Sequence, residues 1–322
     1  IIRDLAINER IPTIRELEYF LAYKGGQSVW RFIATKYGRE KIGEIFQSMK
    51  RYGDAQKGFE NAIGMDFEEL TEQWHKYIKK EYYPDIEGRD EVKDIAKRLT
   101  DHKKAGNFYN VSPTISPDGS HIAVLSDRSG YMDIYLLDAI SGKKVKRLIK
   151  GNRSIDFEEL KFLQPGISWS PDSKKIVIAA KAGSSDALYL IDIETGKQEK
   201  IPFQLDGVFT ASWSPDGNQL AFVGNEGGAS DIYLYDLVSK KLANLTDDVF
   251  SDSEPSWNSD GTQIVFVSDR DKIVNKNDMS SKGMFYHNYN QKNIYTINLE
   301  SKIINQITDT EYNENYPIFS NT

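Results

Sequence analysis

The chain has 322 residues, no cysteine and a net charge of −7, with 39% hydrophobic and 12% aromatic residues. This composition excludes disulfides and thiol chemistry and argues against a disordered chain, and the length predicts more than one domain. No apolar run approaches the ~18 residues of a membrane-spanning helix, and the acidic excess, which lies after residue 100 without basic stripes, argues against a nucleic-acid partner.

Residues 1–97 predict a small all-helical domain. Thr13 and Glu16 form a capping box, which predicts a helix that ends near Tyr23, before the glycine pair 25–26. Apolar residues at helical spacing, bounded by glycines, predict the later helices. Their expected ranges are 28–37, 40–52, 55–63, 66–82 and a last short helix over 89–97.

After residue 97 the sequence becomes a repeat array. A Ser-Pro-Asp-Gly turn or a close variant recurs, with two steps of about 44 residues and two longer ones. A bulky apolar residue precedes each turn, and three short β-rich runs follow it. Four short antiparallel strands in about 40–45 residues are typical of one β-propeller blade. The turns lie at 116–119, 170–173, 214–217 and 258–261, and the residues before them are Ile115, Trp169, Trp213 and Trp257.

The sequence therefore predicts a mainly β fold, in which a β-propeller of four-stranded antiparallel blades follows the all-α N-terminal domain. We expect the domains to be 1–97 and 98–322, with four complete blades plus partial ones, and the three tryptophans to pack between blades. Residues 98–101 repeat the fourth-strand pattern and are predicted to form an isolated outer strand. A further unit begins near Phe319, so we expect an incomplete ring whose exposed flank promotes association.

Two repeat units carry insertions. The segment 151–165 is expected to hold a helical turn around 156–160. The segment 272–292 is a long loop that contains Tyr286 and His287. Long loops in compact folds are usually either functional or disordered.

The motifs of catalysis are absent from the sequence. There is no His-Glu-x-x-His zinc motif, no Gly-x-Ser-x-Gly elbow and no phosphate-binding glycine loop. The four histidines are scattered, and ordinary helix packing is the preferred explanation for His75. We therefore predict no catalytic residue, no metal ligand and no cofactor in this chain.

A Ser-Asp-Arg sequence recurs at the same turn of the first and fourth units, at 126–128 and 268–270. In a functional interpretation, these residues and part of the long insertion line a mouth that binds the carboxylate or backbone of a peptide. In a structural alternative, which is preferred, the aspartate caps its turn and the arginine pairs with a neighbouring carboxylate. The candidate binding residues are Asp127, Arg128, Asp269, Arg270, Tyr286 and His287.

The spacing of Ser-Pro-Asp-Gly, Ser-Asp-Arg…Asp-Ile-Tyr and Leu-Thr-Asp over residues 98–322 resembles that of TolB-type propellers, of the WD-like repeat class. The helical part, through residues 22–30 and 36–42, resembles the region that follows the active site in gluzincin-like peptidases. The resemblance implies a propeller fold, an exported or periplasmic setting and a surface used for protein contacts.

Three hypotheses remain open. In the first, the chain is a non-catalytic module of an exported envelope protein and binds a protein or peptide at its loop face. In the second, it is the accessory or gating part of a zinc metallopeptidase whose catalytic domain lies upstream. In the third, the propeller is a structural spacer. An intact or a degraded His-Glu-x-x-His sequence upstream would distinguish the second hypothesis from the first.

Overall fold

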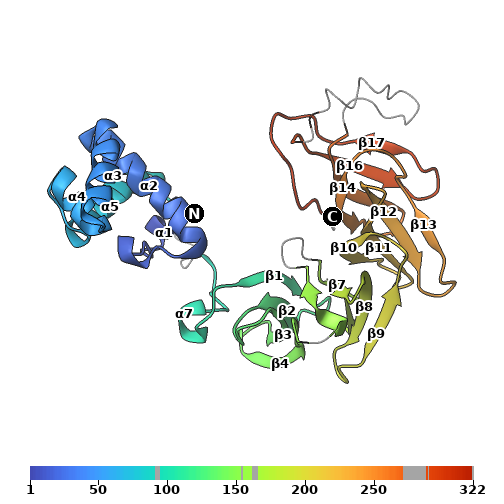
Figure 1. Ribbon diagram of the computed structural model, residues 1–322. Coiled ribbons are helices and arrows are strands. Elements are labelled where there is room, and N and C mark those ends of the chain that lie inside the picture. The colour runs from blue at the N-terminus through green and yellow to red at the C-terminus, as the bar shows by residue number, and fades with distance from the viewer. Residues whose placement is uncertain (91–94, 154, 162–165, 271–287, 289, 321–322) are drawn as a thin grey trace. The chain divides into compact units, whose positions relative to one another are not determined.

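The computed structural model describes residues 1–90, 95–153, 155–161, 166–270, 288 and 290–320. The chain divides into two compact units, Ile1–Lys97 and Arg98–Thr322 (Figure 1). We call them the helical unit and the propeller unit.

The helical unit packs its helices around one apolar core, in which Phe32, Ile45, Leu70 and Trp74 are buried. The expected bounds of its third, fourth and fifth helices agree with the structure to within a residue. No helix among the described residues combines the length and the apolar character needed to cross a membrane. The helices are α1 (Ile2–Ile7), α2 (Tyr19–Tyr37), α3 (Glu40–Tyr52), α4 (Ala55–Ile63) and α5 (Phe67–Tyr82), with 3-10 turns η1 (Ile14–Glu16) and η2 (Tyr83–Asp85).

The predicted break at the glycine pair 25–26 is wrong, because α2 runs through it. Gly25 is buried, and a Cβ atom there would lie 2.3 Å from Cδ2 of Leu17. Glycine therefore allows a close contact here instead of ending the helix. The capping box does form, since the Glu16 carboxylate accepts hydrogen bonds from the amide and hydroxyl of Thr13, but it opens the short turn η1.

The propeller unit contains four antiparallel sheets, which we call blades one to four. Blade one holds β1 (Asn110–Ile115), β2 (His121–Ser126), β3 (Asp133–Asp138) and β4 (Lys144–Ile149). Blade two holds β5 (Glu159–Leu160), β6 (Ser168–Trp169), β7 (Lys175–Ala182), β8 (Ser185–Asp192) and β9 (Gln198–Pro202). Blade three holds β10 (Gly207–Trp213), β11 (Gln219–Glu226), β12 (Ala229–Asp236) and β13 (Leu242–Asn244). Blade four holds β14 (Asp252–Trp257), β15 (Gln263–Ser268), β16 (Asn293–Asn298) and β17 (Ile304–Gln306).

The prediction of a mainly β fold, with four-stranded antiparallel blades behind an all-α unit, is confirmed. Residues 167–246, all of which are described, contain no helix. Blade two departs from the pattern, because its first strand is divided into β5 and β6, which both pair with β7.

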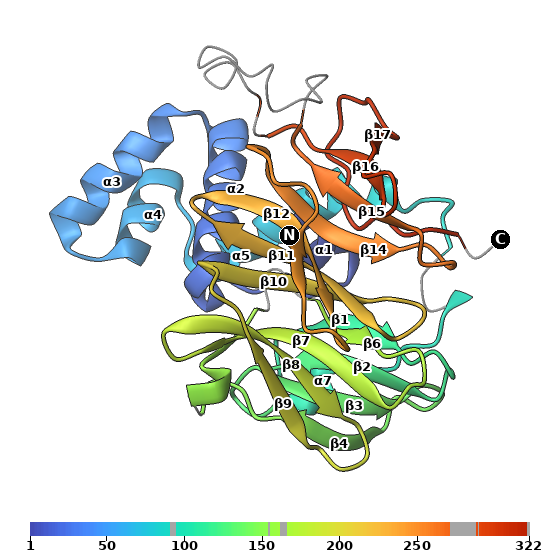
Figure 2. The ribbon, with the colours of Figure 1, turned by 90° about the vertical axis from the view of Figure 1, so that its right-hand side faces the viewer.

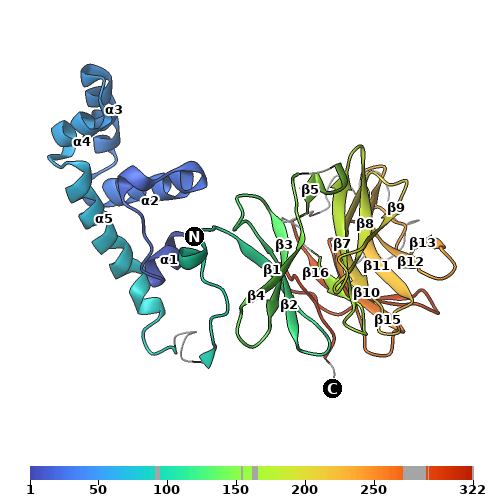
Figure 3. The same ribbon diagram turned by 90° about the horizontal axis from the view of Figure 1, so that it is seen from below.

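Apolar side chains join neighbouring blades, as the repeated tryptophans predict. Each of the three tryptophans is buried in a cluster that spans its own blade and the preceding one. The indole Nε1 of Trp169 donates to the carbonyl of Thr114 at 3.1 Å, and that of Trp257 donates to the carbonyl of Ser212 at 3.1 Å. Strand β10 contacts both β7 and β14 (Figure 2), and blades one and two lie side by side (Figure 3). The indoles of Trp169 and Trp257 therefore link the first strands of neighbouring blades.

Residues 98–101 do not form the predicted strand. They lead as irregular chain into the short helix α7 (His102–Ala105). The backbone of Leu99 lies so close to Gly142 that a Cβ atom there would meet the Leu99 carbonyl oxygen at 2.2 Å. The segment therefore packs against a turn of blade one without joining its sheet. In the first insertion, a 3-10 turn, η3 (Ile155–Phe157), stands where a helical turn was expected.

The contact between α3 and α4 provides a test of the helical unit. A Cβ atom on Gly58 would lie 2.3 Å from Cγ of Met49 and 3.2 Å from the Ile45 carbonyl oxygen, whereas Gly43 has nothing within 4 Å. We expect Gly58→Ala to destabilise the unit by about 1–3 kcal/mol, the usual cost of overpacking. The matched change Gly43→Ala should be neutral or stabilising by up to about 1 kcal/mol, because alanine favours the helix. Denaturant unfolding followed at 222 nm measures both, and equal effects would contradict this close contact.

Candidate functional site: a buried arginine among carboxylates

The fourth-blade Ser-Asp-Arg sequence follows strand β15, opposite the start of β14. The antiparallel register pairs Ser268 directly with Asp252. Side chains at the end of β15 therefore meet those at the start of β14. We call this end of the blades the loop face, because the connections into β14 and out of β15 lie there.

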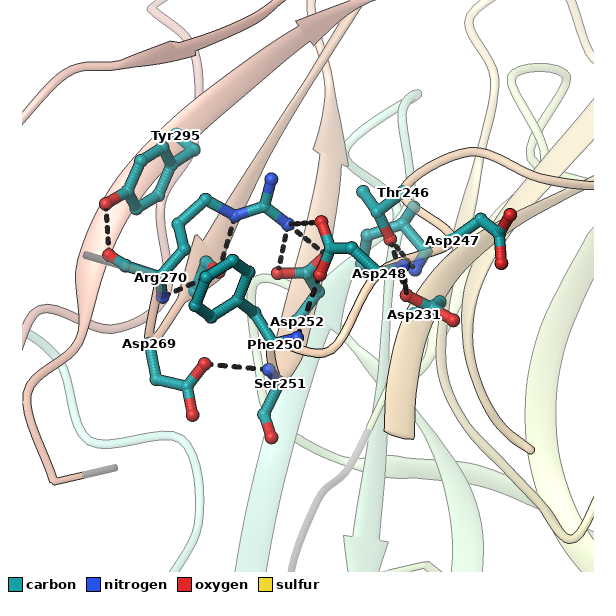
Figure 4. A network of polar contacts seen from close by, with 12 residues as sticks. Asp231, Thr246, Asp247, Asp248, Phe250, Ser251, Asp252, Asp269, Arg270 and Tyr295 are labelled. Atoms are coloured by element: carbon teal, nitrogen blue, oxygen red, sulfur yellow. Dashed lines mark hydrogen bonds and ion pairs between the residues drawn. The ribbon is translucent and has the colours of Figure 1, made fainter. Parts of the chain in front are cut away.

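Arg270 is the centre of a polar network at the loop face (Figure 4). Its side chain is 1% exposed, and its Nη2 donates to Oδ1 and Oδ2 of Asp252 at 2.8 and 2.7 Å. The same nitrogen lies 3.1 Å from Oδ2 of Asp248, and Nε donates to Oγ of Ser268 at 2.8 Å. Three rings lie with their centres 5.2–5.6 Å from the guanidinium carbon, those of Phe250, Phe266 and Tyr295. The cation is thus held by carboxylates and aromatic faces together.

Two further hydrogen bonds fix the loops around Arg270. Oδ1 of Asp269 accepts the backbone N–H of Ser251 at 2.7 Å. The hydroxyl of Tyr295 donates to the carbonyl oxygen of Arg270 at 2.5 Å. These bonds tie the loop after β15 to the loop before β14, so the arginine has one defined position.

Burial sets the electrostatics of this site. Asp252 is fully buried, and burial raises its pKa to about 6 although the Arg270 guanidinium acts in the opposite direction. Burial also raises the pKa of Asp248, again against the effect of Arg270. The low-dielectric surroundings therefore disfavour the ionised forms of Asp248 and Asp252 side by side.

Three aspartates here offer the oxygens that a divalent cation would take. Carboxylate oxygens of Asp231, Asp248 and Asp252 lie within 4.8 Å of one another. However, Arg270 already bonds both oxygens of Asp252, and Asp231 accepts bonds from Asn244 at 2.8 Å and from other neighbours. The guanidinium thus supplies the positive charge that an ion would otherwise supply.

Blade one repeats the same arrangement. Oδ1 of Asp127 accepts the backbone N–H of Tyr109 at 2.8 Å. Nη2 of Arg128 donates to Oδ1 of Asn110 at 3.2 Å. Asn110 occupies the position in β1 that Asp252 occupies in β14. The blade-one arginine therefore bonds a neutral amide where the blade-four arginine bonds a carboxylate.

The candidate residues predicted from sequence thus lie in two separate networks, one in each blade. Their contacts are those of the structural alternative, in which aspartate caps and arginine pairs. A role of these four residues in peptide binding stays a prediction. Tyr286 and His287 lie outside the described residues. Sequence reasoning missed Asp248 and Asp252, whose signal was the acidic run that follows the Leu-Thr of blade three.

A cavity of about 400 Å³ adjoins this network. It lies between the first strands of blades three and four, and Asp252 forms part of its wall. Its other walls come from β10, β11 and the segment 316–318. Asp252 therefore belongs both to the buried network around Arg270 and to the wall of this cavity.

Comparison with known proteins finds similarity to TolB-type propellers. Residues 159–283 match the family model described as a TolB beta propeller domain. The crystal structure of TolB from Acinetobacter baumannii is 23% identical and has a TM-score of 0.49 over 64% of this chain. A structure from Agrobacterium tumefaciens described as TolB is 20% identical and has a TM-score of 0.47 over 62% of this chain.

The chain spans 45% of the length of the first of these structures and 66% of the second. No curated protein matches it. The family match supports the resemblance to TolB-type propellers. The resemblance of the helical unit to gluzincin-like peptidases stays a prediction.

The raised pKa of Asp252 predicts a pH-dependent stability. The usual pKa of an aspartate is 3.8, and that of Asp252 in the folded chain is about 6. Between pH 3.8 and about pH 6, the folded chain therefore binds more protons at this site than the unfolded chain. Stability from this group is therefore present below pH 4 and is lost as the pH rises through about 6. The variant Asp252→Asn copies the blade-one arrangement at Asn110 and removes this titration.

We therefore expect the unfolding free energy of the wild type, minus that of Asp252→Asn, to fall as the pH rises from 4 to 7. Urea unfolding of both proteins across this range measures the difference, in which carboxylates remote from this site cancel. The matched change Asp127→Asn, at a group that does not bond the blade-one arginine, serves as the control. A difference that does not vary with pH would contradict the assigned titration.

Proposed function

We propose that the propeller unit is a non-catalytic module that binds a protein or peptide segment at its loop face. The observation that carries this proposal is the cavity between β10 and β14, whose volume of about 400 Å³ lies in the range of ligand sites. The family match to TolB propellers supports a binding role for the fold.

The composition of the cavity wall suits a peptide better than an apolar small molecule. Apolar side chains from β10 and β11, including Phe209 and Val223, form one part of it. Serines at 230, 251, 253 and 256 contribute hydroxyl groups, and Glu254 and Lys292 contribute opposite charges. A peptide offers backbone amides to the hydroxyl groups and side chains to the apolar wall.

The exported, periplasmic setting is a further part of the proposal and rests on the resemblance to TolB-type propellers. An accessory or gating role beside a zinc peptidase rests only on the sequence of the helical unit. That role would require a His-Glu-x-x-His helix in a catalytic domain upstream of these residues. We favour the binding module because the cavity between β10 and β14 supports it directly.

A random dodecamer peptide display library provides the probe. We expect peptides selected on the wild-type chain to bind Ser256→Trp at least about tenfold more weakly, because the indole fills the cavity that Ser256 lines. The matched control is Ser239→Trp, in the exposed turn between β12 and β13, which should bind as the wild type does. Isothermal titration measures the affinities, and circular dichroism establishes that both variants fold. Failure to select any peptide, or equal loss in both variants, would overturn the proposal.

A further inference from the structure

One backbone position of the propeller repeat is strained in several blades. It lies three residues before the bulky apolar residue that precedes each repeated turn, and three residues before Phe319. Its backbone φ is positive at four residues that are not glycine, although L side chains rarely adopt this conformation. These residues are Ser112 (52°), Thr210 (29°), Glu254 (57°) and Tyr316 (55°), and we call them the strained row.

Irregular strand pairing accompanies the strain. The register shifts between Val111 and Thr114 in β1, and between Ser253 and Ser256 in β14. In β10 it shifts around Thr210. A β-bulge of this kind turns a side chain away from the direction that the regular pleat would give it. Blade two has Gly166 at the same position, where a Cβ atom would lie 2.6 Å from Cα of Thr210.

The strained position varies in chemistry from blade to blade. With Gly166 of blade two included, it holds serine, glycine, threonine, glutamate and tyrosine, whereas the position three residues later is always bulky and apolar. Three row members, Thr210, Glu254 and Tyr316, line the cavity between blades three and four. A repeated strain that brings different side chains to one cavity is typical of a functional site.

The groups at this cavity accept hydrogen bonds and cations. Glu254 accepts the backbone N–H of Tyr316 through Oε2, and a carboxylate has further acceptor capacity. The buried Oδ1 of Asn225 in the cavity wall has no hydrogen-bond partner among the described residues. The ring of Phe209 already has the Nζ of Lys161 4.9 Å from its centre.

These features favour a planar cation with several N–H donors. A guanidinium pairs with carboxylates in parallel, donates to amide oxygens and stacks on aromatic rings, which an ammonium does less well. Among the described residues that line the cavity, Lys292 is the one basic side chain, beside Asp252 and Glu254. Because Arg270 already pairs with Asp252, Glu254 is the carboxylate that remains for a ligand.

We propose that the strained row forms a specificity pocket for an arginine side chain of the bound peptide, with Glu254 as its anionic partner. This inference rests on the proposed peptide-binding function. It assigns Thr210 and Tyr316 to the walls of the pocket. The bulges in β10 and β14 hold Thr210 and Glu254 at the cavity, so these parts of the pocket are formed before the peptide arrives.

The test uses one arginine-containing peptide from the dodecamer selection and the same peptide with citrulline in place of arginine. Citrulline keeps the shape of the side chain and removes its charge. We expect citrulline to weaken binding to the wild type by about tenfold or more, as loss of a charge-assisted hydrogen bond does. Against Glu254→Gln the two peptides should bind within about threefold of each other. The control Glu199→Gln, at an exposed residue of β9, should keep the wild-type preference.

The outcomes separate this inference from the proposed function. If no peptide binds the wild type, the binding function itself fails. If peptides bind but do not distinguish arginine from citrulline, or Glu254→Gln keeps the full preference, the arginine pocket is wrong while the binding function stands. The citrulline peptide tests the contact without any change to the protein, so the result does not depend on the folding of the variant.

Discussion

The propeller unit depends on buried polar groups at the start of the third strand of each blade, because these groups bond the connection to the following segment. Asp133 accepts the backbone N–H of Gly151 at 3.0 Å, and Asp186 accepts that of Val208 at 3.0 Å. Asp231 accepts the N–H of Asp248 at 3.3 Å, and Asn293 accepts that of Thr310 at 3.4 Å. Loss of such an acceptor leaves a buried amide unsatisfied, at a cost of about 1–3 kcal/mol. The repeat residue at the start of the third strand therefore also fixes the backbone of the segment that follows the blade.

Fixed points at its two ends explain how strand β14 sustains its bulge. Strand β14 is held at its start by the pair of Asp252 with Arg270 and at its end by the bond of Trp257 to Ser212. The strained residue Glu254 lies between these two fixed points. Strained backbone persists only where the surroundings over-determine it. The buried arginine thus acts on the cavity indirectly, by fixing the strand that presents Glu254.

The repeat made most of the fold predictable, since turn residues, strand runs and tryptophans recur in phase. Local sequence failed where a tertiary contact decided the outcome, as at Gly25, whose close contact with Leu17 preserves the helix that it was expected to end. Residues 98–101 match the fourth-strand pattern yet have no third strand beside them. The Ser-Asp-Arg sequences were visible, but their partners Asn110 and Asp252 follow only from strand register. The strained row had one sequence signal, the proline after Ser112, Glu254 and Tyr316.

The strained row also separates recognition from stability. The left-handed conformation costs about 1–2 kcal/mol for any residue with a Cβ atom, so changing one such side chain for another alters the fold little. Glycine would relieve the strain, but it would remove the side chain that reaches the cavity. A position whose backbone cost is nearly constant can vary in chemistry from blade to blade, while the bulky apolar residue before each turn and the buried acceptor of each third strand are kept. The repeat can thereby alter what its loop face binds without rebuilding the contacts between its blades.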